Sequence, residues 1–190
     1  MDDHISFRSS ARMAVLNGPG GGPQVACLLL VQGGDPDLQR DDGLELDWLA
    51  TCRSLTPIVE RVSPRCALLD LGACSERAAQ TALEDLLRSL ARIGFVARAG
   101  IAPGITLAHL AAQAATSRQP AVLVTRENAQ GFLRGVPVSA LLSLAGPEWV
   151  TTDVVARLER YGLRTLGQLA RLGELTLRRQ FGAVGGTLPR

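Results

Sequence analysis

Five short apolar runs, each about as long as a β-strand, alternate with helical patterns between residues 25 and 125. Two of them are separated only by Ser63-Pro64-Arg65, which predicts a hairpin. Apolar residues at helical spacing fill the longer intervals, beginning at Leu44. The order strand, helix, hairpin, helix, strand, helix, strand predicts an α+β fold, a sheet covered by helices as in ferredoxin-like folds. The runs are VACLLLVQ (25–32), IVERV (58–62), CALLDL (66–71), FVARAGIA (95–102) and AVLVT (121–125).

Capping residues indicate where the longest helix begins and ends. Ser75 is a suitable N-cap for the apolar stripe at 78–90, and Gly94 is placed to end it. Pro103-Gly104 then turns the chain from the fourth run into an Ala-rich helix, and a short helix is expected at 126–133.

Strand patterns stop beyond residue 137, where two helices are expected. The first begins at Thr151 or Thr152 and ends at Gly162. Thr165 and Gln168 have the spacing of a capping box, which predicts the start of the second. We therefore expect a small all-helical domain at 135–190, after an α+β domain at 25–134 and a flexible N-terminal segment at 1–24.

The C-terminal part carries the positive charge. Residues 1–125 contain 11 Arg and 13 acidic residues, a net −2, whereas residues 126–190 contain 9 Arg and 5 acidic residues, a net +4. This favours the helical domain as the surface for a polyanion such as DNA. A solvated charged face on a small helical bundle explains the same pattern, and both interpretations stay open. The candidate DNA-binding residues are Arg157, Arg160, Arg164, Arg171, Arg178 and Arg179.

The four cysteines match neither a paired zinc motif nor a CxxC redox motif, and we expect buried thiols in a reducing compartment. No cofactor is expected. No apolar stretch is long enough to span a membrane and the N-terminus is acidic, so a cytoplasmic protein without a membrane partner is expected. Aromatic residues make up only 4% of the chain, which weakens a function based on stacking nucleic-acid bases.

Three stretches in register resemble the Y family of damage-tolerant DNA polymerases, most closely its ImuB-like branch. They are LTPIVERVSPRCALLDL (55–71), GFVARAGIAPGITLAHLAAQAA (94–115) and the segment from GVPVSALLSLAG to RRQFG (135–182). A shorter likeness, SSARMAVLNGPG (9–20), resembles a remnant of the finger segment. The resemblance implies a palm-like domain at 25–134 followed by a helical thumb.

The resemblance also implies that the catalytic metal site is missing. Two-metal polymerisation needs clustered carboxylates, because Mg²⁺ takes hard oxygen ligands. The positions that match the family's Asp-Glu pair are Arg65 and Cys66, a fixed cation and a soft ligand. The family's first-strand signature is not found in residues 1–54. We therefore expect the chain to lack the first catalytic strand, a metal site and catalytic residues.

Other positions lack the residues that bind phosphate groups in the family. Where the family has Lys residues that meet the nucleotide triphosphate, the chain has Ile105 and His109, and His109 is read as a packing or solvent-facing residue. The stretch 145–148, Ala-Gly-Pro-Glu, replaces a Gly-x-Gly hairpin and weakens phosphate binding. Asp70 is interpreted as a structural acid at a strand end, with Arg65 as the expected ion-pair partner.

The resulting hypothesis is a noncatalytic Y-family-like protein of DNA damage tolerance and induced mutagenesis, acting as an adaptor or a weak, nonspecific DNA-binding module. By resemblance, its partners would be the replication clamp, an error-prone polymerase and a RecA-like protein. Two alternatives stay open. One is a divergent active polymerase fragment that recruits acids such as Asp35, Asp37, Asp41 or Asp42, and the other is an interaction domain unrelated to DNA.

Overall fold

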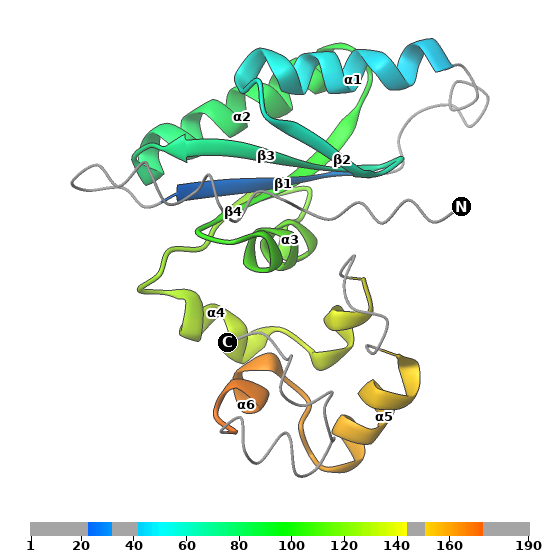
Figure 1. Ribbon diagram of the computed structural model, residues 1–190, viewed down its shortest axis with the longest axis vertical. Coiled ribbons are helices and arrows are strands. Elements are labelled where there is room, and N and C mark those ends of the chain that lie inside the picture. Colours follow the sequence, from blue (N-terminus) through cyan, green and yellow to red (C-terminus); the bar gives the residue numbers. More distant parts are fainter. Residues whose placement is uncertain (1–22, 32–41, 144–150, 173–190) are drawn as a thin grey trace.

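A five-stranded sheet forms the centre of the computed structural model, which describes residues 23–31, 42–143 and 151–172 (Figure 1). Its order is β2-β3-β1-β4-β5, with β5 parallel to β4 and the other neighbours antiparallel. This is the ferredoxin-like order that the sequence predicts, extended by β5. The strands are β1 (Pro23–Val31), β2 (Val59–Ser63), β3 (Cys66–Ala73), β4 (Val96–Ala102) and β5 (Ala121–Leu123).

The expectation that the first strand is missing is wrong as far as the strand itself is concerned. β1 lies in the middle of the sheet and pairs with both β3 and β4. Its sequence, PQVACLLLV, carries no acidic residue, and residues 24–28 are buried, as is usual for a central strand covered on both faces. The position of the first strand is therefore occupied by β1, but β1 carries no carboxylate that could serve as the family's metal ligand.

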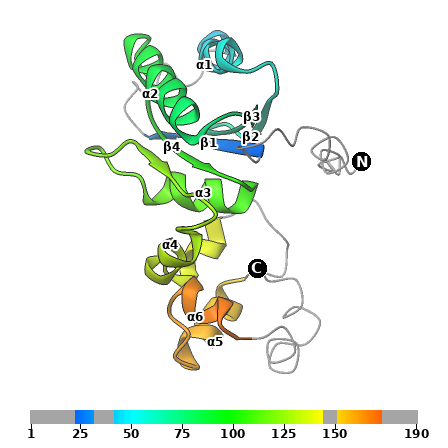
Figure 2. The ribbon, with the colours of Figure 1, turned by 90° about the vertical axis from the view of Figure 1, so that its left-hand side faces the viewer.

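Helices cover both faces of the sheet (Figures 1 and 2). α1 (Asp42–Leu55) and α2 (Glu76–Arg92) lie on one face, and α3 (Ile105–Ala114) lies on the other. Residues of β1 alternate between the two cores, because successive side chains of a strand point to opposite faces. Ala26 and Leu28 pack in the α1/α2 core, whereas Val25 and Cys27 pack in the α3 core.

The predicted helix ends of α2 are confirmed. The Ser75 hydroxyl accepts a hydrogen bond from the backbone N–H of Ala78 at 3.3 Å, so it is the N-cap. Gly94 has a φ of 91°, a conformation that glycine adopts without the steric cost of a Cβ, directly after the helix.

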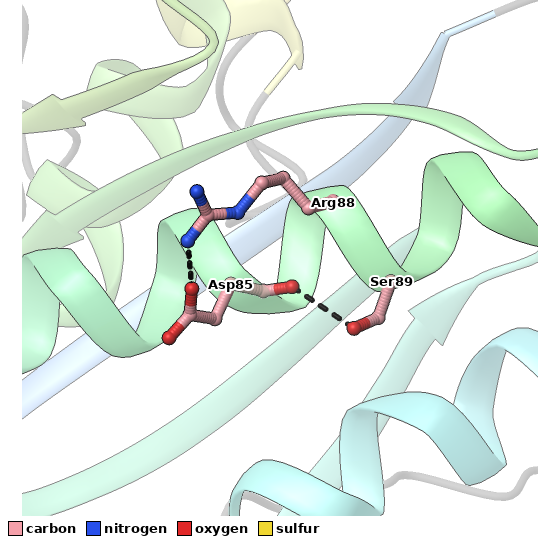
Figure 3. A network of polar contacts seen from close by, with 3 residues as sticks. All are labelled: Asp85, Arg88 and Ser89. Carbon is pink, nitrogen blue, oxygen red and sulfur yellow. Dashed lines mark hydrogen bonds and ion pairs between the residues drawn. The ribbon is translucent and has the colours of Figure 1, made fainter.

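The outer face of α2 is polar and paired within the helix (Figure 3). Arg88 forms an ion pair with Asp85, and the Ser89 hydroxyl donates to the backbone oxygen of Asp85 at 3.0 Å. Both partners of the ion pair are well exposed, with 68% and 59% of the side chain accessible. Ion pairs this exposed add little stability, and the outer face of α2 is a solvated surface.

The C-terminal part of the described chain is helical and shares a core with α3. It contains α4 (Ala129–Gly135), a 3-10 helix η4 (Val138–Ser143), α5 (Thr152–Arg160) and α6 (Leu166–Ala170). Leu110 of α3 packs with Val138, Leu158 and Leu166 in this third core. The predicted capping box at α6 is confirmed. Within the described ranges, no helix is long and apolar enough to cross a membrane.

Candidate functional site: a thiol and imidazole cluster

The β2–β3 hairpin brings Arg65 and Cys66, the positions that match the family's Asp-Glu pair, next to the central strand β1. Arg65 is half-buried in the turn, and its backbone oxygen accepts a hydrogen bond from the N–H of Leu30 on β1 at 2.8 Å. Cys66 is the first residue of β3 and is 4% exposed. The hairpin is thus hydrogen-bonded to the central strand at the position that matches the family's Asp-Glu pair.

Cys66 lies beside a second thiol, Cys27 of β1. Their sulfurs are 3.7 Å apart, and Cys27 has no exposed surface. In the register, Cys27 pairs with Leu68 and Cys66 with Leu29, so the two cysteines are diagonal neighbours on one face of the sheet. That face is the one covered by α3.

α3 adds an imidazole to the two thiols. The donor atoms of Cys27, Cys66 and His109 all lie within 4.8 Å of one another, and His109 is 9% exposed. α3 can approach this closely because β4 has a glycine under it: a Cβ on Gly100 would lie 2.2 Å from the backbone oxygen of Ala108. His109 was interpreted as a packing or solvent-facing residue; it is buried, and its neighbours include two thiols.

The contacts between these groups shift the thiol acidities in opposite directions. The hydrogen bond with Cys27 lowers the pKa of Cys66 to about 5 against the opposing effect of burial, and His109 lowers it further. The same hydrogen bond, followed by burial, raises the pKa of Cys27. These opposite shifts favour ionisation of Cys66 over ionisation of Cys27.

Sequence reasoning did not find this cluster. Cys27 and Cys66 are far apart in the chain and belong to no spacing motif, so each was expected to be an inert buried thiol. The available signal was topological. A ferredoxin-like sheet places its first strand beside the second strand of the hairpin. In this chain a further helix, α3, follows the fourth strand and packs on the face opposite α1 and α2. Those three elements carry Cys27, Cys66 and His109.

The cluster does not suit the magnesium ions of a polymerase. Among the described residues, it is the only group of three or more His, Cys, Asp or Glu side chains close enough to share a metal ion. It contains no carboxylate, and Mg²⁺ requires oxygen ligands in near-octahedral geometry. Arg65, next to Cys66, adds positive charge to the same turn. The arrangement has donors for a thiophilic metal and none for Mg²⁺.

Asp70, by contrast, has a structural role. Its carboxylate accepts a hydrogen bond from the backbone N–H of Gly72 at 2.8 Å, while its backbone oxygen accepts from the Thr56 hydroxyl at 2.6 Å. The ion pair expected with Arg65 stays a prediction.

The candidate DNA-binding arginines lie on the helical part of the chain. Arg157 and Arg160 are on α5, Arg164 is in the turn that follows, and Arg171 is just after α6. All four side chains are exposed. Arg178 and Arg179 lie outside the described residues, as do the N-terminal finger-like stretch, the 145–148 stretch and the side chains of Asp35, Asp37, Asp41 and Asp42. The role of the arginines stays a prediction.

Comparison with known proteins gives relatives in sequence and in fold. The chain is 33% identical over 144 residues to proteins named DNA polymerase IV from Pseudomonas paraeruginosa and Pseudomonas aeruginosa. The match covers 73% of this chain but only 39% of each relative. No model of a known protein family matches.

Solved structures agree on the fold. A DinB-family error-prone DNA polymerase from Sulfolobus solfataricus superposes with a TM-score of 0.64 at 12% identity, covering 86% of this chain and 63% of that one. An insertion ternary complex of the Dbh DNA polymerase gives a TM-score of 0.61 at 14% identity, covering 80% and 43%.

Proposed function

The chain is homologous to the Y-family DNA polymerases in sequence and fold, and we propose that it is a noncatalytic relative of them that acts in DNA damage tolerance. It spans about two fifths of the curated relatives it matches, 39% of their length, so their activity is not assigned to it directly. We also propose that it is closest to the ImuB-like branch, because three stretches of its sequence resemble that branch.

The observation that carries this proposal is the composition of the hairpin and central strand. Cys27 of β1 and Cys66 at the start of β3 lie side by side, and Arg65 precedes Cys66 in the turn. Polymerisation requires carboxylates that hold Mg²⁺ between the incoming phosphates and the primer hydroxyl. Thiols and a guanidinium do not provide these ligands. No catalytic step by the metal-dependent route can therefore be built from these residues.

The remaining surface supports a binding role. The exposed arginines of α5, α6 and the turn between them supply cations for a phosphate backbone, giving weak, nonspecific and salt-sensitive contact with DNA. We propose that the protein works in the cytoplasm as an adaptor. Its partners would be a replication clamp, an error-prone polymerase and a RecA-like protein.

Primer extension tests the noncatalytic proposal. The purified chain is incubated with a labelled primer-template and the four deoxynucleotides, once with Mg²⁺ and once with Mn²⁺, beside a Y-family polymerase as positive control. We expect no added nucleotide under either condition. Measurable extension would overturn the proposal and favour the divergent active polymerase, an alternative that deserves a direct test because the named relatives are polymerases.

A DNA titration distinguishes an adaptor that binds DNA from an interaction domain unrelated to DNA. Fluorescence anisotropy of labelled primer-template is followed at low and at moderate salt. Binding that weakens steeply with salt supports the proposal, since each phosphate contact releases counterions. No binding at low salt would favour the interaction domain unrelated to DNA.

A further inference from the structure

We propose that Cys27, Cys66 and His109 form a zinc site between β1, β3 and α3, at the position where the family resemblance leads one to expect magnesium carboxylates. This inference goes beyond the proposed function. It depends on the donor atoms of this chain and holds whether or not the chain extends a primer.

The two sulfurs already have the separation that zinc requires. With Zn–S bonds of about 2.3 Å and tetrahedral angles, two thiolate ligands lie about 3.8 Å apart. The sulfurs of Cys27 and Cys66 are 3.7 Å apart. Zinc could thus bind both thiolates with no movement of the strands, which are fixed by their ladder.

The imidazole completes three protein ligands. For Zn–N of about 2.0 Å, a nitrogen lies about 3.5 Å from each sulfur in a tetrahedral site. The His109 donor is within 4.8 Å of both, so a shift of roughly 1 Å or a change of rotamer closes the site. Water takes the fourth position. Binding forms two Zn–S bonds and one Zn–N bond and releases the remaining thiol protons to solvent.

The surroundings favour zinc over other uses of the same residues. A disulfide is disfavoured, because diagonal cross-strand neighbours have Cα atoms about 7–8 Å apart whereas disulfides need less than about 7 Å. The four cysteines are free thiols. Thiolate and imidazole donors favour thiophilic ions such as Zn²⁺ over Mg²⁺. Cys66 also adjoins the exposed turn at Ser63 and Pro64, which gives an ion a short path from solvent.

The chain offers a closely matched control. Cys52 on α1 is as fully buried as Cys27, but it packs in the core on the opposite face of the sheet and belongs to no ligand group among the described residues. Replacing either thiol by Ala removes one buried sulfur. Only the change on the α3 side removes a proposed ligand, so a difference between Cys27→Ala and Cys52→Ala separates metal binding from packing.

The first experiment measures metal content and ligand type. The reduced full chain is stripped with a chelator, incubated with Zn²⁺ in the presence of excess Mg²⁺, desalted and analysed by elemental mass spectrometry. We expect one zinc per chain. Substitution with Co²⁺ should give a sulfur-to-metal charge-transfer band and the visible bands of a tetrahedral site. Absence of bound zinc, or a Co²⁺ spectrum of octahedral type, would overturn the proposal without reference to any variant.

The second experiment identifies the ligands. Competition with a chromogenic zinc chelator should show that Cys66→Ala, Cys27→Ala and His109→Gln each weaken zinc binding by at least about a hundredfold, more than the loss of an outer-shell partner. Cys52→Ala should bind like the unchanged protein, and circular dichroism checks that each variant is folded. Equal zinc affinity in Cys66→Ala and Cys52→Ala contradicts the site, as does a Cys27–Cys66 disulfide in protein purified under reducing conditions.

Discussion

Gly100 of β4 pairs with Cys27 of β1, and the gap between Gly100 and α3 is too small for a side chain. A Cβ there would lie 2.2 Å from the backbone oxygen of Ala108 and 2.3 Å from the backbone nitrogen of Ala112. Both are main-chain atoms of α3, so a Cβ at this position could be accommodated only if the helix moved. The glycine therefore sets how near α3, and His109 with it, comes to the two thiols.

We predict that Gly100→Ala destabilises the fold by about 1–3 kcal/mol, the usual cost of forcing an extra carbon into a packed core. Urea denaturation gives the free energy of unfolding. Gly131→Ala is the control, because Gly131 lies inside α4 with no atom within 4 Å of its Cβ position. That change should be neutral or stabilising by about 0.5–1 kcal/mol. Equal effects at the two glycines would contradict the close approach of α3.

Zinc should raise the thermal stability if the cluster binds it as proposed. A ligand that binds only the folded state at about 100 times its dissociation constant adds about 2.7 kcal/mol. Differential scanning fluorimetry should therefore show a higher Tm with Zn²⁺, lost on adding chelator, and no rise with Mg²⁺. Cys52→Ala should keep the zinc-dependent rise and Cys66→Ala should lose it. A rise of the same size in both variants would point to binding elsewhere.

The fold could be predicted from the sequence because its signals are local. The Ser63-Pro64-Arg65 turn between two apolar runs predicted the hairpin, and Ser75 and Gly94 predicted the ends of α2 within a residue or two. Element order then restricted the sheet to a ferredoxin-like arrangement. The first strand was expected to be missing because its catalytic signature is absent, but VACLLLVQ has the pattern of a buried strand and forms β1.

The candidate site could be predicted only in part because it depends on contacts between distant segments. The resemblance singled out Cys66 and His109 one at a time, as residues that replace something else. Cys27 was not predicted as a site residue, because no neighbouring sequence pattern distinguishes its thiol from that of Cys52. Only the pairing register and the close approach of α3 over Gly100 bring Cys27, Cys66 and His109 together.

Stability should fall at alkaline pH in part through Cys52. Burial raises its pKa from 9.0 to about 11, with Arg53 acting in the opposite direction. Between these values the unfolded thiol loses its proton while the folded thiol keeps it, so the unfolded state binds fewer protons and stability declines as pH rises. The loss approaches about 2 kcal/mol by pH 11.

Urea denaturation between pH 8 and 11 measures this decline. Cys52→Ala should be less stable at pH 8 because it leaves a cavity, but its stability should fall less steeply as pH rises. Cys74→Ala, at a half-exposed thiol, is the control and should change the slope less. Parallel curves for the unchanged protein and Cys52→Ala would show that this thiol ionises alike in the folded and unfolded states.

The start of α5 depends on one hydroxyl. Thr151 accepts a hydrogen bond from the backbone N–H of Val154 at 3.3 Å, whereas the adjacent Thr152 is the exposed first residue of the helix. Thr151→Ala should lower the free energy of unfolding by about 1 kcal/mol, the usual effect of losing an N-cap. Thr152→Ala should stay within about 0.5 kcal/mol of the unchanged protein. Chemical denaturation of both variants checks the difference, and equal losses would contradict the cap.

DNA binding, finally, should depend on the position of arginines and not only on their number. The double variant Arg157→Gln with Arg160→Gln removes two cations from α5, where we propose contact with the phosphate backbone. If both contact phosphates, the slope of log affinity against log salt should become shallower by roughly 1.5–2. Fluorescence anisotropy over a range of salt concentrations measures this slope.

The matched control removes two cations from α2, at the opposite end of the molecule from α5 (Figures 1 and 2). Arg88→Gln with Arg92→Gln gives the same change in net charge on an exposed helix face, one arginine of which is already paired with Asp85. We expect its salt slope to match that of the unchanged protein, because charges farther from DNA than about one Debye length are screened. Equal slopes for the two double variants would mean that net charge, and not a surface on α5, accounts for the binding.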